Sequence, residues 1–226
     1  MEKFLKGISF FTIVTLKSLS TYKVNLAVFF ASAWIGALSY FFNANFRDVV
    51  ISEYGVNYTS FAVAGAVATC FLSVTSVVLT PQDLTLFGFW ERVVGGVAAD
   101  FTLGIAKALP VLALASGMLK PTVWLALTVP MAFLLFVVVS ALLTVSDTLT
   151  FYENPVRWAF FGFWNLLGGV WFPVEALPSY LKYLAYLLPQ YHMVALMRDP
   201  LIGKLPLFSM AYAILFTSIS LPAVKW

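Results

Sequence analysis

Few side chains in this sequence could take part in chemistry, and they are scattered along it. The chain holds a single cysteine, Cys70, and a single histidine, His192, among 226 residues. One cysteine cannot form a disulfide within the chain, and one histidine cannot supply a metal cluster. Glu175 and His192 could form an acid–base pair, but two predicted helix breaks separate them. We expect Glu175 to mark a helix boundary and His192 to lie at an interface.

Catalytic sequence patterns are missing as well. The sequence contains no G-x-x-x-x-G-K-[ST] loop, so it cannot cradle nucleotide phosphates in the P-loop manner. It also lacks the H-E-x-x-H metal motif and the nucleophile elbow of hydrolases. We therefore expect this chain to have no enzymatic activity and to bind no cofactor or metal.

Two ionisable residues fall within or beside a predicted membrane span. Asp100 and Lys107 are seven residues apart and share a helix face, with Lys107 about 10 Å deeper by helical rise. An ionisable group inside a membrane is a candidate functional residue. The long Lys107 side chain could instead snorkel back to the cytoplasmic interface, which is the interpretation we favour.

The composition predicts the environment of these residues. Hydrophobic residues make up 62% of the chain and charged residues 10%, and the mean hydropathy is +0.93. Such a composition indicates a multi-pass protein of the cell membrane. The net charge of +3 is dispersed, and no basic run interleaves with aromatic residues, which argues against a nucleic-acid partner.

Apolar runs of membrane length predict an all-α fold with six transmembrane helices. An amphipathic segment at 1–23 should lie along the membrane surface, because its lysines alternate with apolar residues. More of the Lys and Arg residues fall on the side of the N-terminus, which places both termini in the cytoplasm. The predicted spans cover residues 24–46, 54–81, 101–119, 122–146, 158–173 and 205–224.

The stretch between the fifth and sixth spans, residues 174–200, cannot cross a membrane. Segments 179–188 and 190–199 each cover about half the required depth. Proline disfavours helix at the residue before it, so Pro178, Pro189 and Pro200 predict boundaries between short helices. We expect a hairpin that lies at one membrane face or dips in and returns.

Tyrosines along this hairpin suit a membrane boundary, because each ring is apolar and each hydroxyl can reach water. They are Tyr180, Tyr183, Tyr186 and Tyr191. Arg198 and Asp199 should lie near the outer headgroups, where Arg198 could meet an anionic substrate group. Simple anchoring of Arg198 to lipid is the role that we favour.

A series of residues in this region resembles the C-terminal signature of the ABC-2 type family of ABC transporter permeases. The series is Gly168-Gly169, Trp171-Phe172-Pro173, Glu175, Leu177-Pro178, Pro189 and Arg198. The resemblance implies an external re-entrant hairpin between helices 5 and 6 that forms part of an outer gate. The gate residues would be Pro173, Glu175, Pro178, Tyr180, Tyr183, Pro189 and Arg198.

The polar stretch at 83–96 is similar to the first cytoplasmic loop of the same family. Asp83 is a suitable helix N-cap, and the short helix that follows should end at Gly95-Gly96. In the family, a helix at this place docks on the ATPase subunit. The implied contact residues are Asp83, Phe87, Trp90, Glu91 and Arg92. The acidic residue that usually follows the glycine is absent, since Val97-Ala98-Ala99 stand there.

The resemblance implies the permease subunit of an ATP-driven exporter, embedded among membrane lipids. Two permease chains, identical or paired, would each engage a separate ATPase subunit, and that subunit would bind ATP and magnesium. Family substrates are lipidic, glycan or amphipathic drug-like molecules. Two other classes remain open: a membrane scaffold or subunit of another complex that transports nothing, and a secondary transporter, which would need buried ion-coupling residues.

Overall fold

The computed structural model describes residues 2–21, 47–71, 88–115, 117–149, 167–170 and 172–223. All regular secondary structure in these parts is helical, as the sequence predicts, with eight α-helices and two short 3-10 helices. In chain order they are α1 (Glu2–Thr21), α3 (Arg47–Tyr54), α4 (Tyr58–Phe71), α6 (Phe89–Ala115), α7 (Leu125–Leu149), η2 (Val174–Ala176), α9 (Ser179–Leu187), α10 (Pro189–Arg198), η3 (Asp199–Ile202) and α11 (Leu207–Ala223).

Two helices, α6 and α7, are long and apolar enough to cross a membrane. The qualifying stretches are Phe89–Ala113, with mean hydropathy 1.4, and Leu125–Ser146, with mean hydropathy 2.5. At 1.5 Å per residue each helix is about 38 to 40 Å long, more than the roughly 30 Å of a hydrocarbon core. Helices α4 and α11 are apolar but shorter. The expected span at 24–46, most of the one at 158–173 and the end of the one at 54–81 lie outside the described residues, so a count of six stays a prediction.

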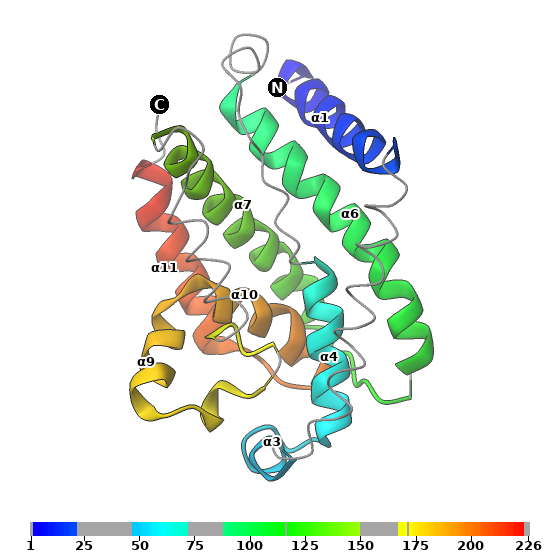
Figure 1. Cartoon of the computed structure of the whole chain (residues 1–226), viewed down its shortest axis with the longest axis vertical. Coiled ribbons are helices and arrows are strands. Elements are labelled where there is room, and N and C mark those ends of the chain that lie inside the picture. Colours follow the sequence, from blue (N-terminus) through cyan, green and yellow to red (C-terminus); the bar gives the residue numbers. More distant parts are fainter. Residues whose placement is uncertain are drawn as a thin grey trace.

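The long helices give the molecule two distinct ends. Helix α6 runs away from the termini, and α7 and α11 return toward them (Figure 1). The start of α1 and the end of α11 therefore lie at the same end of the molecule, which we call the terminal end. Helices α3 and α9 lie at the opposite end, which we call the hairpin end (Figure 1).

Helix α1 packs along α6 through a close backbone approach at Gly95. A Cβ at this position would lie 2.7 Å from the Cβ of Phe11 and 2.9 Å from the carbonyl oxygen of Ile8. The Thr12 hydroxyl also donates a hydrogen bond to the Gly95 carbonyl, at 3.1 Å. Small residues allow such contact between helices in an apolar environment.

The expected helix boundary at Gly95-Gly96 is wrong. Helix α6 is continuous from Phe89 to Ala115, so there is no separate short helix ending at these glycines. A glycine inside a helix costs about 1 kcal/mol relative to alanine. Here packing against α1 offsets that cost, which the local pattern of residues could not reveal.

The expected start of the second span is also wrong. Tyr54 ends the short helix α3, and a turn at Gly55, with φ of 67°, separates it from α4, which begins at Tyr58. Positive φ is accessible to glycine at little cost. The turn folds α3 back so that the Tyr54 ring packs on Phe61, with ring centroids 4.8 Å apart.

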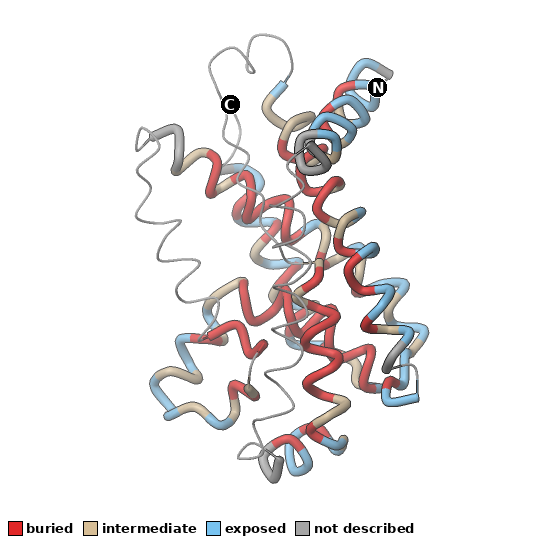
Figure 2. Tube along the Cα trace, turned by 45° about the vertical axis from the view of Figure 1, so that its right-hand side comes forward, coloured by how far each residue is buried: buried red, intermediate tan, exposed pale blue. Residues whose placement is uncertain are grey.

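The buried core runs through α4, α7 and α10. Buried residues gather at the centre of the molecule and exposed ones at its periphery (Figure 2). Helix α10 contacts α4, α7 and α11. All of its residues from Gln190 to Arg198 are buried, including the polar ones. In α6, Lys107 is 4% exposed and Asp100 is 1% exposed, so the expected snorkelling of Lys107 to an interface is wrong.

Candidate functional site

The hairpin predicted between the last two spans is present as α9 and α10. The helices meet at Leu188, whose φ of −92° and ψ of 136° are extended, and Pro189 occupies the first turn of α10. Proline suits this position because the amide that it lacks would have no partner within the helix. With 9 and 10 residues, each helix is far shorter than a membrane span.

Arg198 ends α10 and has no exposed surface (0%). Its three guanidinium nitrogens all donate hydrogen bonds. Nε donates to Asp199 Oδ1 at 2.8 Å, Nη1 to the Gly169 carbonyl at 2.9 Å, and Nη2 to the Tyr54 hydroxyl at 3.0 Å. The favoured role of Arg198 as a lipid anchor is therefore wrong, because the cation is bound inside the protein.

Two aromatic rings complete the environment of this cation. The guanidinium carbon lies 4.8 Å from the ring centroid of Tyr54 and 4.5 Å from that of Phe61. Contacts of this kind stabilise a desolvated cation through the ring quadrupole. Lys204 also lies near the Tyr54 ring, at 4.7 Å from its centroid, and donates a hydrogen bond to the Glu53 carbonyl.

The hydrogen bonds continue from Arg198 to the start of the hairpin. The Tyr54 hydroxyl accepts from Arg198 and donates to Glu175 Oε2 at 2.9 Å. The Tyr186 hydroxyl donates to Glu175 Oε1 at 3.4 Å. Glu175 lies in η2, between the longer helices, as its expected boundary role requires. We call the connected set the Arg198 network, and it consists of Tyr54, Gly169, Glu175, Tyr186, Arg198 and Asp199.

Gly169 accepts the Arg198 hydrogen bond through its backbone carbonyl while its own backbone has a positive φ. Its φ is +66°, and a Cβ there would lie 2.9 Å from Val174 Cγ2 and 3.6 Å from Arg198 Nη1. A side chain at this position would be strained and would crowd Val174. Within the pair Gly168-Gly169, the second glycine thus has a physical role, which is to accept a hydrogen bond from Arg198.

Burial and the contacts between members of the Arg198 network determine which of them are protonated. Burial opposes the charge on Arg198, but Asp199 and the hydroxyls of Tyr54 and Tyr191 outweigh this effect and raise the pKa of Arg198. Burial also raises the pKa of Tyr54 well above its ordinary value, so the Tyr54 hydroxyl keeps its proton. The network therefore holds its arrangement of donors and acceptors across the neutral pH range.

His192 joins the hairpin to the last helix. Its Nε2 donates to the Tyr186 carbonyl at 2.9 Å, and its Nδ1 accepts from the Ser209 hydroxyl at 3.1 Å. A carbonyl can only accept, so the first bond assigns the proton to Nε2. The ring stacks on Tyr212 at 3.7 Å between centroids, and the Tyr212 hydroxyl donates to the Leu187 carbonyl at 2.9 Å. We call this group the His192 clip, and it consists of Tyr186, Leu187, His192, Ser209 and Tyr212.

The clip satisfies the carbonyls at the end of α9, which have no partner within that helix. Burial lowers the pKa of His192 to about 4, against the opposing effect of its bond to Tyr186. His192 is fully buried, so its expected place at an interface is wrong. His192 and Glu175 bond to different groups and do not form an acid–base pair in this structure.

The remaining predicted gate residues divide between surface and interior. Tyr180 and Tyr183 are 72% and 70% exposed, and Pro178 is exposed beside them. Pro173 is buried, and Pro189 is half-buried. The hairpin thus has one outward helix, α9, and one enclosed helix, α10.

The predicted ATPase contact lies at the terminal end. Asp83 and Phe87 fall outside the described residues. Trp90, Glu91 and Arg92 occupy the first turn of α6, and all three are half-buried. The Arg92 guanidinium lies 5.3 Å from the ring centroid of Phe11, so α1 covers part of this surface.

The sequence prediction missed Tyr54 as a site residue. The hydropathy pattern makes Tyr54 the first residue of a span, although Gly55 beside it is a signal for a turn. Within the described ranges, no group of three or more His, Cys, Asp or Glu could hold a metal ion. Neither a protein-family model nor a curated protein sequence matches this chain.

Proposed function

We propose that the chain is the membrane-spanning permease subunit of an ATP-driven exporter resembling the ABC-2 type, with α9 and α10 in its outer gate. The observation that carries this proposal is a helical hairpin that cannot cross a membrane, yet has one helix enclosed and bonded at its end by Arg198. It lies at the end of the molecule opposite the termini and directly before an apolar helix (Figure 1). A passive surface loop would not need a buried cation.

In this proposal the Arg198 network keeps the gate closed. It connects α3 with both parts of the hairpin, so opening requires several hydrogen bonds to break together. Packed interfaces with such networks tend to occupy discrete arrangements rather than to deform continuously. The exposed tyrosines of α9 then face the outer headgroups or a second permease chain.

Helix α6 is suited to transmit motion from the ATPase subunit. It is continuous from the predicted docking residues Glu91 and Arg92 to Ala115, near the hairpin end. A displacement of its first turn would be passed along the helix toward Pro110, where a helix can bend. Helix α6 contacts α4 and α7, and both contact α10, so a contiguous path of packed helices reaches the hairpin.

Copurification tests the class of protein most directly. The full chain, extracted from its native membrane in mild detergent, should bring down a P-loop ATPase. Substituting Glu91 and Arg92 by alanine should weaken that association or uncouple hydrolysis from export while the chain stays folded. Recovery of a different assembly without an ATPase would contradict the proposal and favour a scaffold.

A secondary transporter is the second candidate, and the buried Asp100 and Lys107 of α6 favour it. Export by the purified chain in liposomes, driven by an ion gradient without ATP, would identify this class. Replacement of residues 174–199 by a flexible linker tests the gate itself. We expect the variant to insert and to bind the ATPase but not to export, whereas normal export would show that the hairpin is not a gate.

A further inference from the structure

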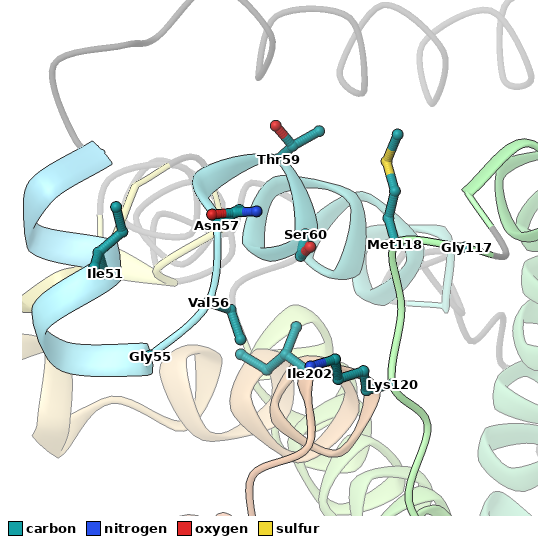
Figure 3. A pocket seen from close by; sticks show the side chains of 10 residues that line it. All are labelled: Ile51, Gly55, Val56, Asn57, Thr59, Ser60, Gly117, Met118, Lys120 and Ile202. Atoms are coloured by element: carbon teal, nitrogen blue, oxygen red, sulfur yellow. The ribbon is translucent and has the colours of Figure 1, made fainter.

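A cavity of about 550 Å³ opens at the hairpin end, between the turn that joins α3 to α4, the segment at 117–120, and η3. Figure 3 labels the residues that line it. Ligand pockets of proteins have volumes of about 300 to 1,000 Å³. The space is thus sufficient for a small molecule or for part of a lipid.

The described lining has both an apolar and a polar part. Ile51, Val56 and Ile202 contribute aliphatic side chains, whereas Asn57 and Ser60 contribute an amide and a hydroxyl. Lys120 adds a positive charge, and no described lining residue is acidic. In Figure 3 the Lys120 side chain extends toward Ile202, so the cation lies beside an apolar wall. This combination favours a ligand that carries an anionic group and an apolar chain.

The walls of the cavity are continuous with the Arg198 network. Gly55 and Val56 directly follow Tyr54, and Ile202 ends the 3-10 helix that begins at Asp199. The Lys120 amide donates to the Leu201 carbonyl at 2.8 Å, which fixes the Lys120 segment against that same helix. An occupant would therefore touch both sides of the junction that the network holds together.

We propose that this cavity binds an anionic lipid of the surrounding leaflet, with its headgroup at Lys120 and part of an acyl chain against Ile51, Val56 and Ile202. The cavity lies at the ends of α3 and α4 rather than along α6 or α7, which is where headgroups would meet a protein with membrane-crossing helices. The inference rests on the membrane location in the proposed function and not on export.

The test uses the full chain in nanodiscs of neutral phosphatidylcholine, titrated with phosphatidylglycerol. Native mass spectrometry counts retained lipid, and the melting temperature is followed in parallel. We expect Lys120→Gln to weaken phosphatidylglycerol binding about fivefold, the effect of one surface lysine on anionic lipid. Lys120→Arg should bind as the wild type does. Lys182→Gln, on α9 at the same end of the molecule, is the matched control and should leave binding unchanged.

Three outcomes would overturn the inference. They are equal binding by Lys120→Gln and the wild type, equal loss with Lys182→Gln, and equal stabilisation by inorganic phosphate alone, which would indicate an anion site without a place for the chain. Ser60→Trp, which fills the cavity and keeps the lysine, should also reduce binding. None of these measurements involves an ATPase or export. A result that overturns the lipid site would therefore leave the permease proposal intact.

Discussion

The terminal end and the hairpin end are stabilised by different kinds of contact. At the terminal end, α1 lies on α6 through a glycine and a close approach of two backbones. At the hairpin end, a buried cation, two carboxylates, two tyrosine hydroxyls and a backbone carbonyl are joined by directed hydrogen bonds. The first kind of contact is mainly steric, with one hydrogen bond from Thr12 to the Gly95 carbonyl. The second kind is either formed or broken, which is the property that the proposed gate would need.

Substitution of Arg198 by an uncharged residue should have the largest effect on stability. Arg198→Met removes three hydrogen bonds and leaves the buried Asp199 carboxyl without its cationic partner. Breaking a buried pair in this way costs about 3 to 5 kcal/mol. Thermal unfolding in detergent measures the loss, and Lys182→Met, on the outward helix α9, should cost less than about 0.5 kcal/mol. Equal melting temperatures for the two variants would mean that the network does not stabilise the hairpin end.

Removal of one oxygen from the network should have the next largest effect. Tyr54→Phe keeps the ring beside Arg198 but deprives both Arg198 Nη2 and Glu175 Oε2 of a partner. Hydrogen bonds to charged groups contribute about 1.5 to 3 kcal/mol, so we expect destabilisation in that range. Tyr180→Phe, whose hydroxyl lies on an exposed residue, is the control. The comparison can be made by thermal unfolding under the same conditions.

Acid should weaken the hairpin end through His192. The pKa of His192 is lowered to about 4, so the unfolded chain takes up the proton first as pH falls below about 6.5. The contribution of His192 to the free energy of unfolding is therefore fully present above that pH. It declines toward pH 4, and about 2 kcal/mol of it is lost at pH 5. The melting temperature of His192→Gln, measured between pH 7 and 5, should fall less steeply than that of the wild type. Parallel curves would show that other groups cause the acid effect.

A larger side chain between α1 and α6 should have the smallest effect on the whole molecule. Gly95→Leu would force α1 away from α6, at a local cost of about 1 to 3 kcal/mol. Because α1 lies at the periphery, hydrogen exchange should increase in α1 and stay unchanged in α10. Ala106→Leu, at an exposed position of the same helix, is the control. Increased exchange in α10 would indicate that the two ends are coupled.

The sequence predicts helices well where length and proline determine them. The break at Leu188-Pro189 and the helix of the N-terminal segment are confirmed, because proline chemistry and amphipathic periodicity act locally. The burial of Arg198 and Lys107 could not be predicted in this way. The environment of Arg198 depends on Tyr54 and Phe61, which lie far away in the sequence, and Lys107 is enclosed by packing between helices. A charged side chain near a predicted interface gives no local sign of whether lipid or protein surrounds it.

The Arg198 network also constrains how the protein is made. Tyr54 and Arg198 are 144 residues apart, so a ribosome completes α3 and α4 long before it supplies the cation that bonds to Tyr54. Long-range contacts close late because the intervening chain must first be ordered. Until then, the Tyr54 hydroxyl and the Gly169 carbonyl lack this partner, and the hairpin cannot be fixed in its buried position. The hairpin end is therefore completed only after Arg198 has been synthesised, when α3, α4, α6 and α7 are already present.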